Sequence, residues 1–346
     1  MYLDWNATAP LSERVRDFYM DALLRYGANA HSQHQQGRDT SVAVEKAREN
    51  FANCVGVVSK QVRFTSGATE GNSWILSTFA KQGSILTSAI EHPSVLEWSN
   101  AQIAVNADGE IDLASLKMQL QSQSFALVSV MAANNESGVI QPIGEIFEIC
   151  QHYQVPFHCD ASQVINRIDP DISADYMTFS GHKMGAPKGV GAVVLKNELT
   201  SLLKGGPQER GSRAGTLNSP AIVTMSWVAS QAQAMDNHYQ ILLEESLKKH
   251  FGATVIGEAA KRLPNTSLVK FRSPGDMVVM VLDMLGIAVS TGSACSSGSS
   301  KQSNVLKAMG LDGIPVRFSW GHESDIPSII PIIINGLQNL ENTCEW

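Results

Sequence analysis

Two short apolar runs in the middle of the chain, residues 155–159 and 176–179, each end in a group of polar residues. The groups contain Asp160 and Gln163 after the first run, and Ser180, His182 and Lys183 after the second. In an open α/β sheet, ligands bind just beyond the carboxyl ends of the strands, so these side chains would converge on one crevice. An acid, an amide, a hydroxyl, an imidazole and an amine suit pyridoxal 5'-phosphate (PLP), with Lys183 as the Schiff-base amine.

Each of these residues also has an ordinary structural explanation. A lysine at a strand end is usually solvated, but the company of Ser180 and His182 favours the Schiff-base role for Lys183. Asp160 would be costly to bury without a partner, and a protonated pyridine nitrogen is a suitable one. A helix cap or a salt bridge is the alternative for Asp160. Gln163, three residues later, is placed to reach the phenolic oxygen of the ring.

Four further segments carry candidate residues. Ser66-Gly67-Ala68-Thr69 joins a predicted strand to a predicted helix, and exposed amides at a helix start can hold a phosphate, although plain caps are common there. His92, beside Pro93, could stack on a planar ring or simply cap a turn. Asn135 and Arg317 are candidates for holding a substrate carboxylate, the alternative for Arg317 being a surface arginine.

Cys295 stands out among the five cysteines of the chain. It lies in a Gly/Ser-rich segment, residues 290–300, which predicts a mobile surface loop that could carry a thiolate into and out of a site. Cys54, Cys150 and Cys159 have apolar neighbours and are predicted to be small core residues. The odd count and the absence of C-x-x-C spacing indicate neither a disulfide framework nor a structural zinc site, and the pair His31 and His34 is too few ligands for a metal.

Composition narrows the class of protein. The chain has 346 residues, 43% of them hydrophobic, which is enough for one large and one smaller domain. The formal charge of −7 and the lack of a basic run make nucleic acid and anionic membranes poor partners. The first residues lack the pattern of a secretory signal, and the longest apolar runs fall far short of a bilayer span. We therefore expect a cytoplasmic protein.

The elements that must position these residues alternate along the chain. From residue 62 onward, strand-like and helix-like segments follow one another to residue 196, which predicts an α/β domain with a mostly parallel, helix-covered sheet. Residues 205–216 form a turn-rich connection, and one long helix is expected from about 220 to 247. We assign residues 12–244 to a large domain, and residues 1–11, an arm outside the core, together with 245–346 to a small α/β domain whose strands are expected near 268–271, 288–289 and 316–318.

Eight motifs, in this order, resemble those of the cysteine desulfurases, which are PLP enzymes of fold type I in the class V aminotransferase-like group. The similarity is to the members with a long catalytic-cysteine loop. It runs nearly from end to end through residues 2–10, 64–70, 91–93, 134–138, 180–183, 208–211, 292–296 and 316–319. Any one of these motifs is weak, but eight in order at compatible spacing are highly specific.

The resemblance implies a role for each candidate. Lys183 would carry PLP and act as base, Asp160 would pair with the pyridine nitrogen, Gln163 with the phenolic oxygen, and His92 would stack on the ring. The phosphate would be held by Ala68, Thr69, Ser180 and His182, and by Thr216 from the other subunit of a homodimer. Asn135 and Arg317 would hold the carboxylate of L-cysteine, and Cys295 would accept its sulfur. No metal is implied.

The implied activity converts L-cysteine to L-alanine and a persulfide on Cys295, which a sulfur-acceptor protein would receive for iron–sulfur cluster or other sulfur-compound biosynthesis. A selenocysteine lyase or a cysteine or cystine lyase on the same fold is the alternative, followed by a non-catalytic partner in sulfur delivery. The chain departs from the family pattern at His322, where a second arginine is usual, and in the loop from Gly27 to His31.

Overall fold

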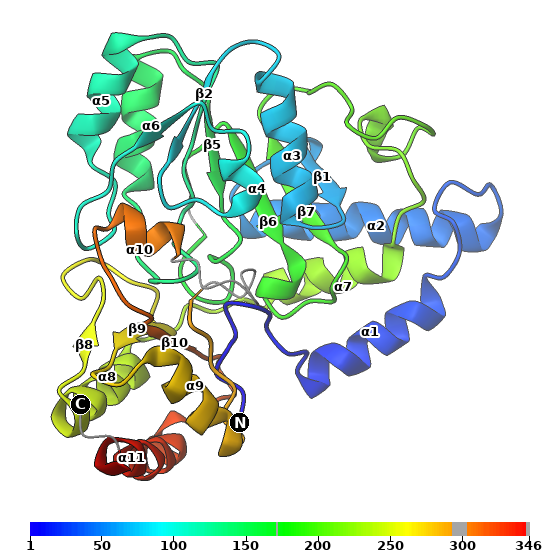
Figure 1. Ribbon diagram of the computed structural model, residues 1–346. Coiled ribbons are helices and arrows are strands. Elements are labelled where there is room, and N and C mark those ends of the chain that lie inside the picture. The colour runs from blue at the N-terminus through cyan, green and yellow to red at the C-terminus, as the bar shows by residue number, and fades with distance from the viewer. Residues whose placement is uncertain (171, 293–302, 344–346) are drawn as a thin grey trace.

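A seven-stranded sheet forms the centre of the larger part of the molecule (Figure 1), and the computed structural model describes residues 1–170, 172–292 and 303–343. Within these residues the strand order is β1-β7-β6-β5-β4-β2-β3. The strands are β1 (Val62–Thr65), β2 (Ile85–Ser88), β3 (Ala101–Ile103), β4 (Leu127–Ser129), β5 (Phe157–Asp160), β6 (Tyr176–Ser180) and β7 (Gly191–Leu195).

The strand directions bring the chemistry to one edge. Strands β2, β3, β4, β5 and β6 pair in parallel, and β7 is antiparallel to both of its neighbours, β6 and β1. Strand β1 therefore points the same way as β6. The carboxyl ends of β1, β2, β4, β5 and β6 consequently meet along the same edge of the sheet, where ligands bind in open α/β folds. The predicted mostly parallel α/β sheet is confirmed.

Helices cover both faces of this sheet because successive residues of its buried strands point to opposite sides. On β6, Tyr176 packs with Trp74 and Phe79 of α3 (Ala68–Phe79), while Met177 and Phe179 belong to the core on the other face. That other core is completed by side chains of α2 (Gln35–Cys54), α5 (Leu113–Ser122), α6 (Ile143–His152) and α7 (Ser219–Ser230). The short helix α4 (Pro93–Leu96) packs against α3.

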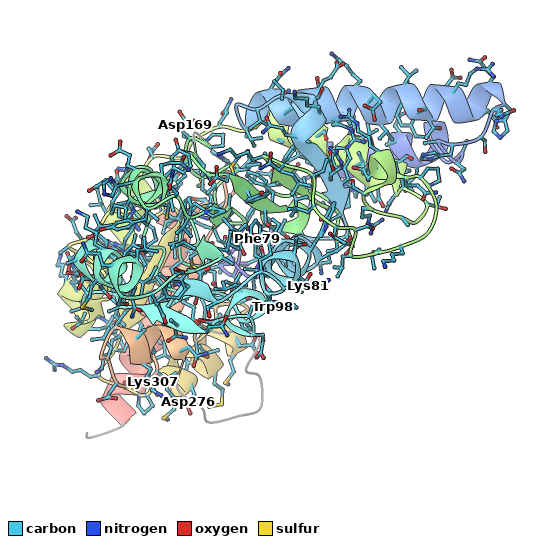
Figure 2. The ribbon with its side chains drawn as sticks, turned by 90° about the horizontal axis from the view of Figure 1, so that it is seen from above. Phe79, Lys81, Trp98, Asp169, Asp276 and Lys307 are labelled. Carbon is cyan, nitrogen blue, oxygen red and sulfur yellow. The ribbon has the colours of Figure 1, made fainter. Side chains whose placement is uncertain are left out.

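Two helices extend from one end of this body (Figures 1 and 2), α1 (Glu13–Arg25) and α2. The predicted N-cap Ser12 accepts a hydrogen bond from the Val15 amide, and His34 caps α2 by accepting one from the Gly37 amide. His34 is therefore a capping residue. Among the described residues, no group of His, Cys, Asp and Glu side chains is arranged to hold a metal ion.

A smaller unit has its own antiparallel sheet of β8 (Thr254–Val255), β9 (Thr266–Lys270) and β10 (Val316–Ser319), in the order β10-β9-β8. It is packed with α8 (His238–Phe251), α9 (Gly275–Met284) and α11 (Ile326–Thr343), and α10 (Asn304–Ala308) belongs to a separate apolar cluster with Leu268. In the part of the chain that the structure describes, no helix has the length and apolar character needed to cross a membrane.

Three expectations about these elements are wrong. The long helix expected over 220–247 is two helices, α7 and α8, because residues 231–237 leave the helix and the Met235 amide instead bonds to the Arg167 carbonyl. Asp236 then accepts from the His238 amide at the start of α8, a side-chain bond that competes with helix continuation. The expected strand at 288–289 is only an isolated bridge between Ala288 and Tyr2, and β8 is the third strand of the small sheet.

The third correction concerns the N-terminal arm, which is not peripheral. Leu3 and Asn6 are each about 1% exposed, and Leu3 belongs to the core of the small unit. Tyr2 and Asp4 form bridges with Ala288 and Ser319, so the arm runs alongside β10. Gly321 has no room for a side chain, since an added Cβ would lie 2.2 Å from the Trp5 ring. The arm is thus an integral element that reaches from the small sheet to the main one.

Candidate active site

A cavity of about 900 Å³ lies at the carboxyl edge of the main sheet. Ten of the residues selected from the sequence line it together: Ala68, Thr69, His92, Asn135, Asp160, Gln163, Ser180, His182, Lys183 and Arg317. They come from the segments that follow β1, β2, β4, β5 and β6, and from β10. The parallel strands therefore bring together residues that lie up to about 250 positions apart in the sequence.

Lys183 ends the short 3-10 helix η2 (Gly181–Lys183), which directly follows β6. Its Nζ donates to the backbone carbonyls of Asn6 at 2.5 Å and Ala7 at 2.8 Å. The same Asn6 carbonyl accepts a bond from Gln163 Nε2 at 3.1 Å. The N-terminal arm therefore holds both the amine and the amide in place.

Asp160 is the last residue of β5 and is 6% exposed. One carboxylate oxygen accepts bonds from the Ser162 amide and hydroxyl, and the other accepts from Asn72 Nδ2 at 2.8 Å. These donors stabilise the ionised carboxylate in a buried place. Such a carboxylate, aimed into a cavity, can pair with a cationic ring nitrogen.

Asn72 connects Asp160 to His92 on the neighbouring segment. Its Nδ2 also donates to Ser94 Oγ at 3.0 Å, and Ser94 Oγ lies 2.8 Å from His92 Nδ1. His92 Nδ1 accepts the Ser94 amide at 3.1 Å, so a neutral His92 carries its proton on Nε2. Burial lowers the pKa of His92, and Lys183 lowers it further while Asp160 raises it. The net effect is a neutral imidazole in a defined tautomer.

The far end of the cavity is electropositive and lies at the start of α3. Burial lowers the pKa of His182 to about 4, and the charges of Lys183, Lys188 and Arg167 contribute. His182 Nδ1 lies 3.1 Å from the Thr8 hydroxyl. The backbone of β7 packs directly against the turn before α3, because a Cβ atom added to Gly191 would lie 2.7 Å from Gly67 Cα. Amides at the start of a helix, hydroxyls and nearby cations form a site suited to a phosphate.

Arg317, on β10, is 1% exposed and points to the other end of the cavity. Its guanidinium donates to the carbonyls of Asn135 at 2.8 Å and Gly292 at 2.7 Å, and pairs with Asp4 at 2.6 Å. The sequence did not identify Asp4 as the partner. The Asp4 carboxylate and the two carbonyls thus hold the guanidinium in a fixed orientation before the substrate carboxylate binds.

Glu91 is a buried acid that sequence reasoning left without a role. It is 3% exposed, and its Oε1 accepts bonds from the Ser88 hydroxyl and from the Met131 amide at 2.8 Å. Burial raises the pKa of Glu91 to about 8, and Asp160 adds to the effect while the two hydrogen bonds oppose it. The side chain that lines the cavity beside His92 is therefore a neutral carboxylic acid at pH 7.

Two selected residues lie apart from this group. Thr216 is exposed and does not line the cavity of its own chain. Its loop is anchored by two ion pairs, the buried pair of Arg48 with Glu209 at 2.7 Å and the half-buried pair of Glu70 with Arg213 at 2.8 Å. Cys295 lies outside the described residues, as does Cys344. Of the other cysteines, Cys150 and Cys159 are buried and Cys54 is half-buried, as predicted.

The arrangement fits PLP. Gln163 is 4% exposed, and its Oε1 has no hydrogen-bond partner within the described ranges. Because buried polar atoms are normally hydrogen-bonded, this side chain is expected to contact a polar ligand. Gln163 Nε2 has a second N–H group beyond the one that it donates to Asn6, and this can reach a phenolic oxygen. Asp160 would hold the ring nitrogen, His92 would lie against the ring, and Lys183 would hold the aldehyde carbon. The helix start, the hydroxyls and Lys188 would hold the phosphate.

Sequence reasoning missed Asn6, Asn72, Ser94 and Arg167. One signal for Asn72 was available, because Asn72, Ile75, Leu76 and Phe79 follow the i, i+3, i+4, i+7 spacing of one helix face, and Asn72 is the polar member of that apolar face. A polar residue at such a position must find a buried partner. Asn6 had no comparable signal, since its role depends on where the arm crosses the sheet.

Comparisons with known proteins agree with this geometry. The aminotransferase class-V family model matches residues 1–326. "Cysteine desulfurase IscS" of Dictyoglomus turgidum is 35% identical, over 93% of this chain and 88% of its own length. "Cysteine desulfurase" of Trichormus azollae is 36% identical, over 96% of this chain and 92% of its own.

Solved structures give the same result. A NifS-like protein from Rickettsia africae has a TM-score of 0.89 and 30% identity, with 99% of each chain covered. A structure described as SspA in complex with cysteine has a TM-score of 0.83 and 27% identity, covering 92% of this chain and 98% of its own. The chain therefore belongs to the aminotransferase class-V family, whose cofactor is pyridoxal 5'-phosphate.

Proposed function

We propose that this protein is a cysteine desulfurase that takes sulfur from L-cysteine, releases L-alanine and holds the sulfur as a persulfide on Cys295. The observation that carries the proposal is the convergence of Lys183, Asp160 and His92 on one cavity that Arg317 closes at the other end. The relatives named above, which are similar over nearly the whole chain, carry the same activity in their names.

Arg317 and Asn135 bind the substrate carboxylate in this proposal. The guanidinium is oriented by Asp4 and by two backbone carbonyls, so little side-chain freedom is lost when the substrate binds. The carboxylate would thereby fix the amino acid with its Cα–H bond near Lys183.

Lys183 and His92 move protons. The amine of Lys183, once replaced by the substrate amine, is the base that removes the Cα proton, and bound PLP supplies an electron sink for the resulting pair. The neutral His92 carries its proton on Nε2, and its Nδ1 already accepts the Ser94 amide, so His92 can donate the Nε2 proton but would accept a proton only by giving up the Ser94 contact. Its fixed tautomer places the exchangeable proton on Nε2.

The sulfur step requires Cys295 as a thiolate. Its sulfur attacks the substrate sulfur, an S–S bond forms and the C–S bond breaks. The electron pair of the broken bond stays with the carbon, which gains protons to give alanine. The persulfide then passes to an acceptor protein, and iron–sulfur cluster or other sulfur-compound biosynthesis is the expected destination.

A homodimer is part of the proposal. Met20 and Leu24, one turn apart on α1, and Val42 on α2 are 56%, 85% and 70% exposed, and exposed apolar side chains on the extending helices suit a subunit interface. The anchored loop that carries the exposed Thr216 would reach the phosphate site of the second subunit. Light scattering on the purified protein tests this, and a monomer at micromolar concentration with full activity would contradict it.

The decisive test of the activity is alanine release from L-cysteine in the presence of reductant, followed by mass analysis for a persulfide on Cys295. Cys295→Ala is expected to lose alanine release, while Cys54→Ala, remote from the cavity, retains it. The same assay with selenocysteine and cystine distinguishes the lyase alternatives. A Cys295→Ala protein that releases alanine from cysteine at the full rate would falsify the assignment.

A further inference from the structure

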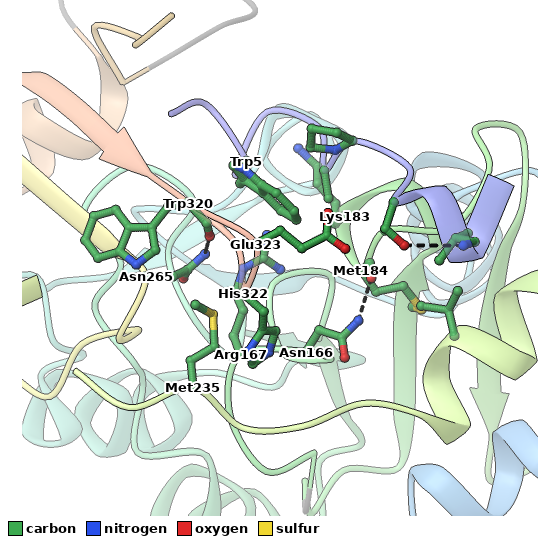
Figure 3. Close-up of a pocket in the computed structure, with 17 residues that line it drawn as sticks. Trp5, Asn166, Arg167, Lys183, Met184, Met235, Asn265, Trp320, His322 and Glu323 are labelled. Atoms are coloured by element: carbon green, nitrogen blue, oxygen red, sulfur yellow. Dashed lines mark hydrogen bonds between the residues drawn. The ribbon is translucent and has the colours of Figure 1, made fainter. Parts of the chain in front are cut away.

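A second, smaller cavity shares one lining residue, Lys183, with the first. Its volume is about 120 Å³, which is room for several water molecules or one small organic anion. Figure 3 shows Trp5, Trp320, Arg167 and Lys183 around it, contributed by the arm, the end of β10, the turn after β5 and η2. Neither the cofactor nor the substrate carboxylate of the proposed reaction has been placed in this cavity.

Arg167 is the unusual residue in its wall. The side chain is 3% exposed, yet its Nε and Nη1 atoms have no hydrogen-bond partner, and it forms no ion pair within the described part of the chain. Buried cations are normally paired, because an isolated charge is costly to remove from water. Burial lowers the pKa of Arg167 to about 9, and Arg317 lowers it further, with no acid acting in the other direction. The protein therefore holds a cation here without supplying its counter-ion.

We propose that this cavity is a binding site for a small carboxylate, with Arg167 as the counter-ion. A guanidinium matches the planar carboxylate group. The walls also include Met184, Val228 and Met235, which suit a short apolar tail. Among the described residues, Arg167 is the one lining cation that remains once Lys183 is joined to the cofactor, and the exposed Glu323 lies at the rim, so the cavity favours a monoanion over a phosphate dianion.

The site is independent of the proposed activity and is tested by binding. Equilibrium dialysis of PLP-loaded protein against radiolabelled acetate, at constant ionic strength with chloride, should detect saturable binding. Arg167→Met keeps the length of the side chain and removes the charge, and it should weaken that binding by at least about tenfold.

Two controls locate the site. Arg16→Met removes an exposed arginine of α1 and should leave acetate binding unchanged. Arg317→Met removes the cation of the larger cavity, and the Arg167-dependent binding should survive it. Excess unlabelled L-alanine separates the two sources of the ligand: displacement indicates an amino-acid carboxylate, and retention indicates a free short-chain acid. Absence of saturable acetate binding in the parent protein, or equal binding by Arg167→Met, overturns the proposal, since the cavity would then hold only water.

Discussion

The backbone carbonyl of Asn6 lies 2.5 Å from the Nζ atom of Lys183, although the two residues are 177 positions apart. The arm that carries this carbonyl runs alongside β10, the strand that carries Arg317. The same segment therefore orients the amine at one end of the cavity and, through Asp4, the guanidinium at the other. The N-terminal arm therefore connects the small unit to the main sheet at the cavity.

Replacing Lys183 removes the proposed base. Lys183→Ala should lower the rate of alanine release by at least about 10²–10⁴-fold, the usual contribution of a positioned acid or base. Borohydride treatment should also no longer attach PLP to the protein. The exposed Lys81→Ala is the matched control and should retain both properties. Equal activity in the two variants would show that another group removes the proton.

Arg317 should act on substrate affinity. Arg317→Lys keeps the charge but loses the planar fork, and we expect KM for L-cysteine to rise by about 10–100-fold, with a smaller change in kcat. Arg262 of the small unit, which pairs with Glu244 at 2.6 Å, provides a control of similar burial. Arg262→Lys should leave KM unchanged, and a purely structural role for Arg317 would make the two variants behave alike.

The chain of hydrogen bonds from Asp160 to His92 should behave as a coupled unit. Asn72→Ala leaves a buried carboxylate oxygen without a donor and should lower the free energy of unfolding by about 1–3 kcal/mol. Ser94→Ala interrupts the same chain closer to His92. A double-mutant cycle on unfolding and on kcat should give a coupling energy of about 0.5–3 kcal/mol. Strict additivity of the two substitutions would show that the two contacts act separately.

Glu91 should make the folded protein less stable at alkaline pH. Because the folded-state pKa of about 8 lies above the ordinary value of 4.5, the folded state binds the proton more tightly, and this stabilisation is full below pH 4.5 and is lost as the pH rises through 8. Glu91→Gln, which cannot ionise, should remove this dependence, which amounts to about 5 kcal/mol over the whole range and to about 2 kcal/mol of it between pH 6.5 and 8.

The measurement is denaturant unfolding of the holoenzyme between pH 6.5 and 9. His158 and His182 have folded-state pKa values lowered by burial to about 4, so they stay neutral in the folded protein but gain protons in the unfolded state near pH 6.5. Their effect opposes that of Glu91 and is shared by the parent and Glu91→Gln, so the comparison of the two proteins removes it. The exposed Glu97→Gln is the control and should keep the parent slope. A parent protein whose stability does not fall between pH 7 and 9 would contradict the prediction.

Much of the cavity was predictable because parallel strands place their carboxyl ends together. Polar residues that directly follow apolar runs, such as Asp160 and Lys183, must then meet at that edge. The fold class followed from the same alternation of strands and helices. The break between α7 and α8 was not predictable from periodicity, since it depends on the bond between Met235 and the Arg167 carbonyl in another segment.

By itself, the sequence determined the types of groups at the strand ends, and hence the class of cofactor, because those groups are adjacent to local apolar patterns. Only the tertiary structure decided which distant residues hold them. Asn6 reaches Lys183, Asp4 reaches Arg317 and Asn72 reaches Asp160 through contacts that no local pattern records. The physical reason is that a buried polar atom requires a partner, but the partner can come from any segment that packing brings within about 3 Å.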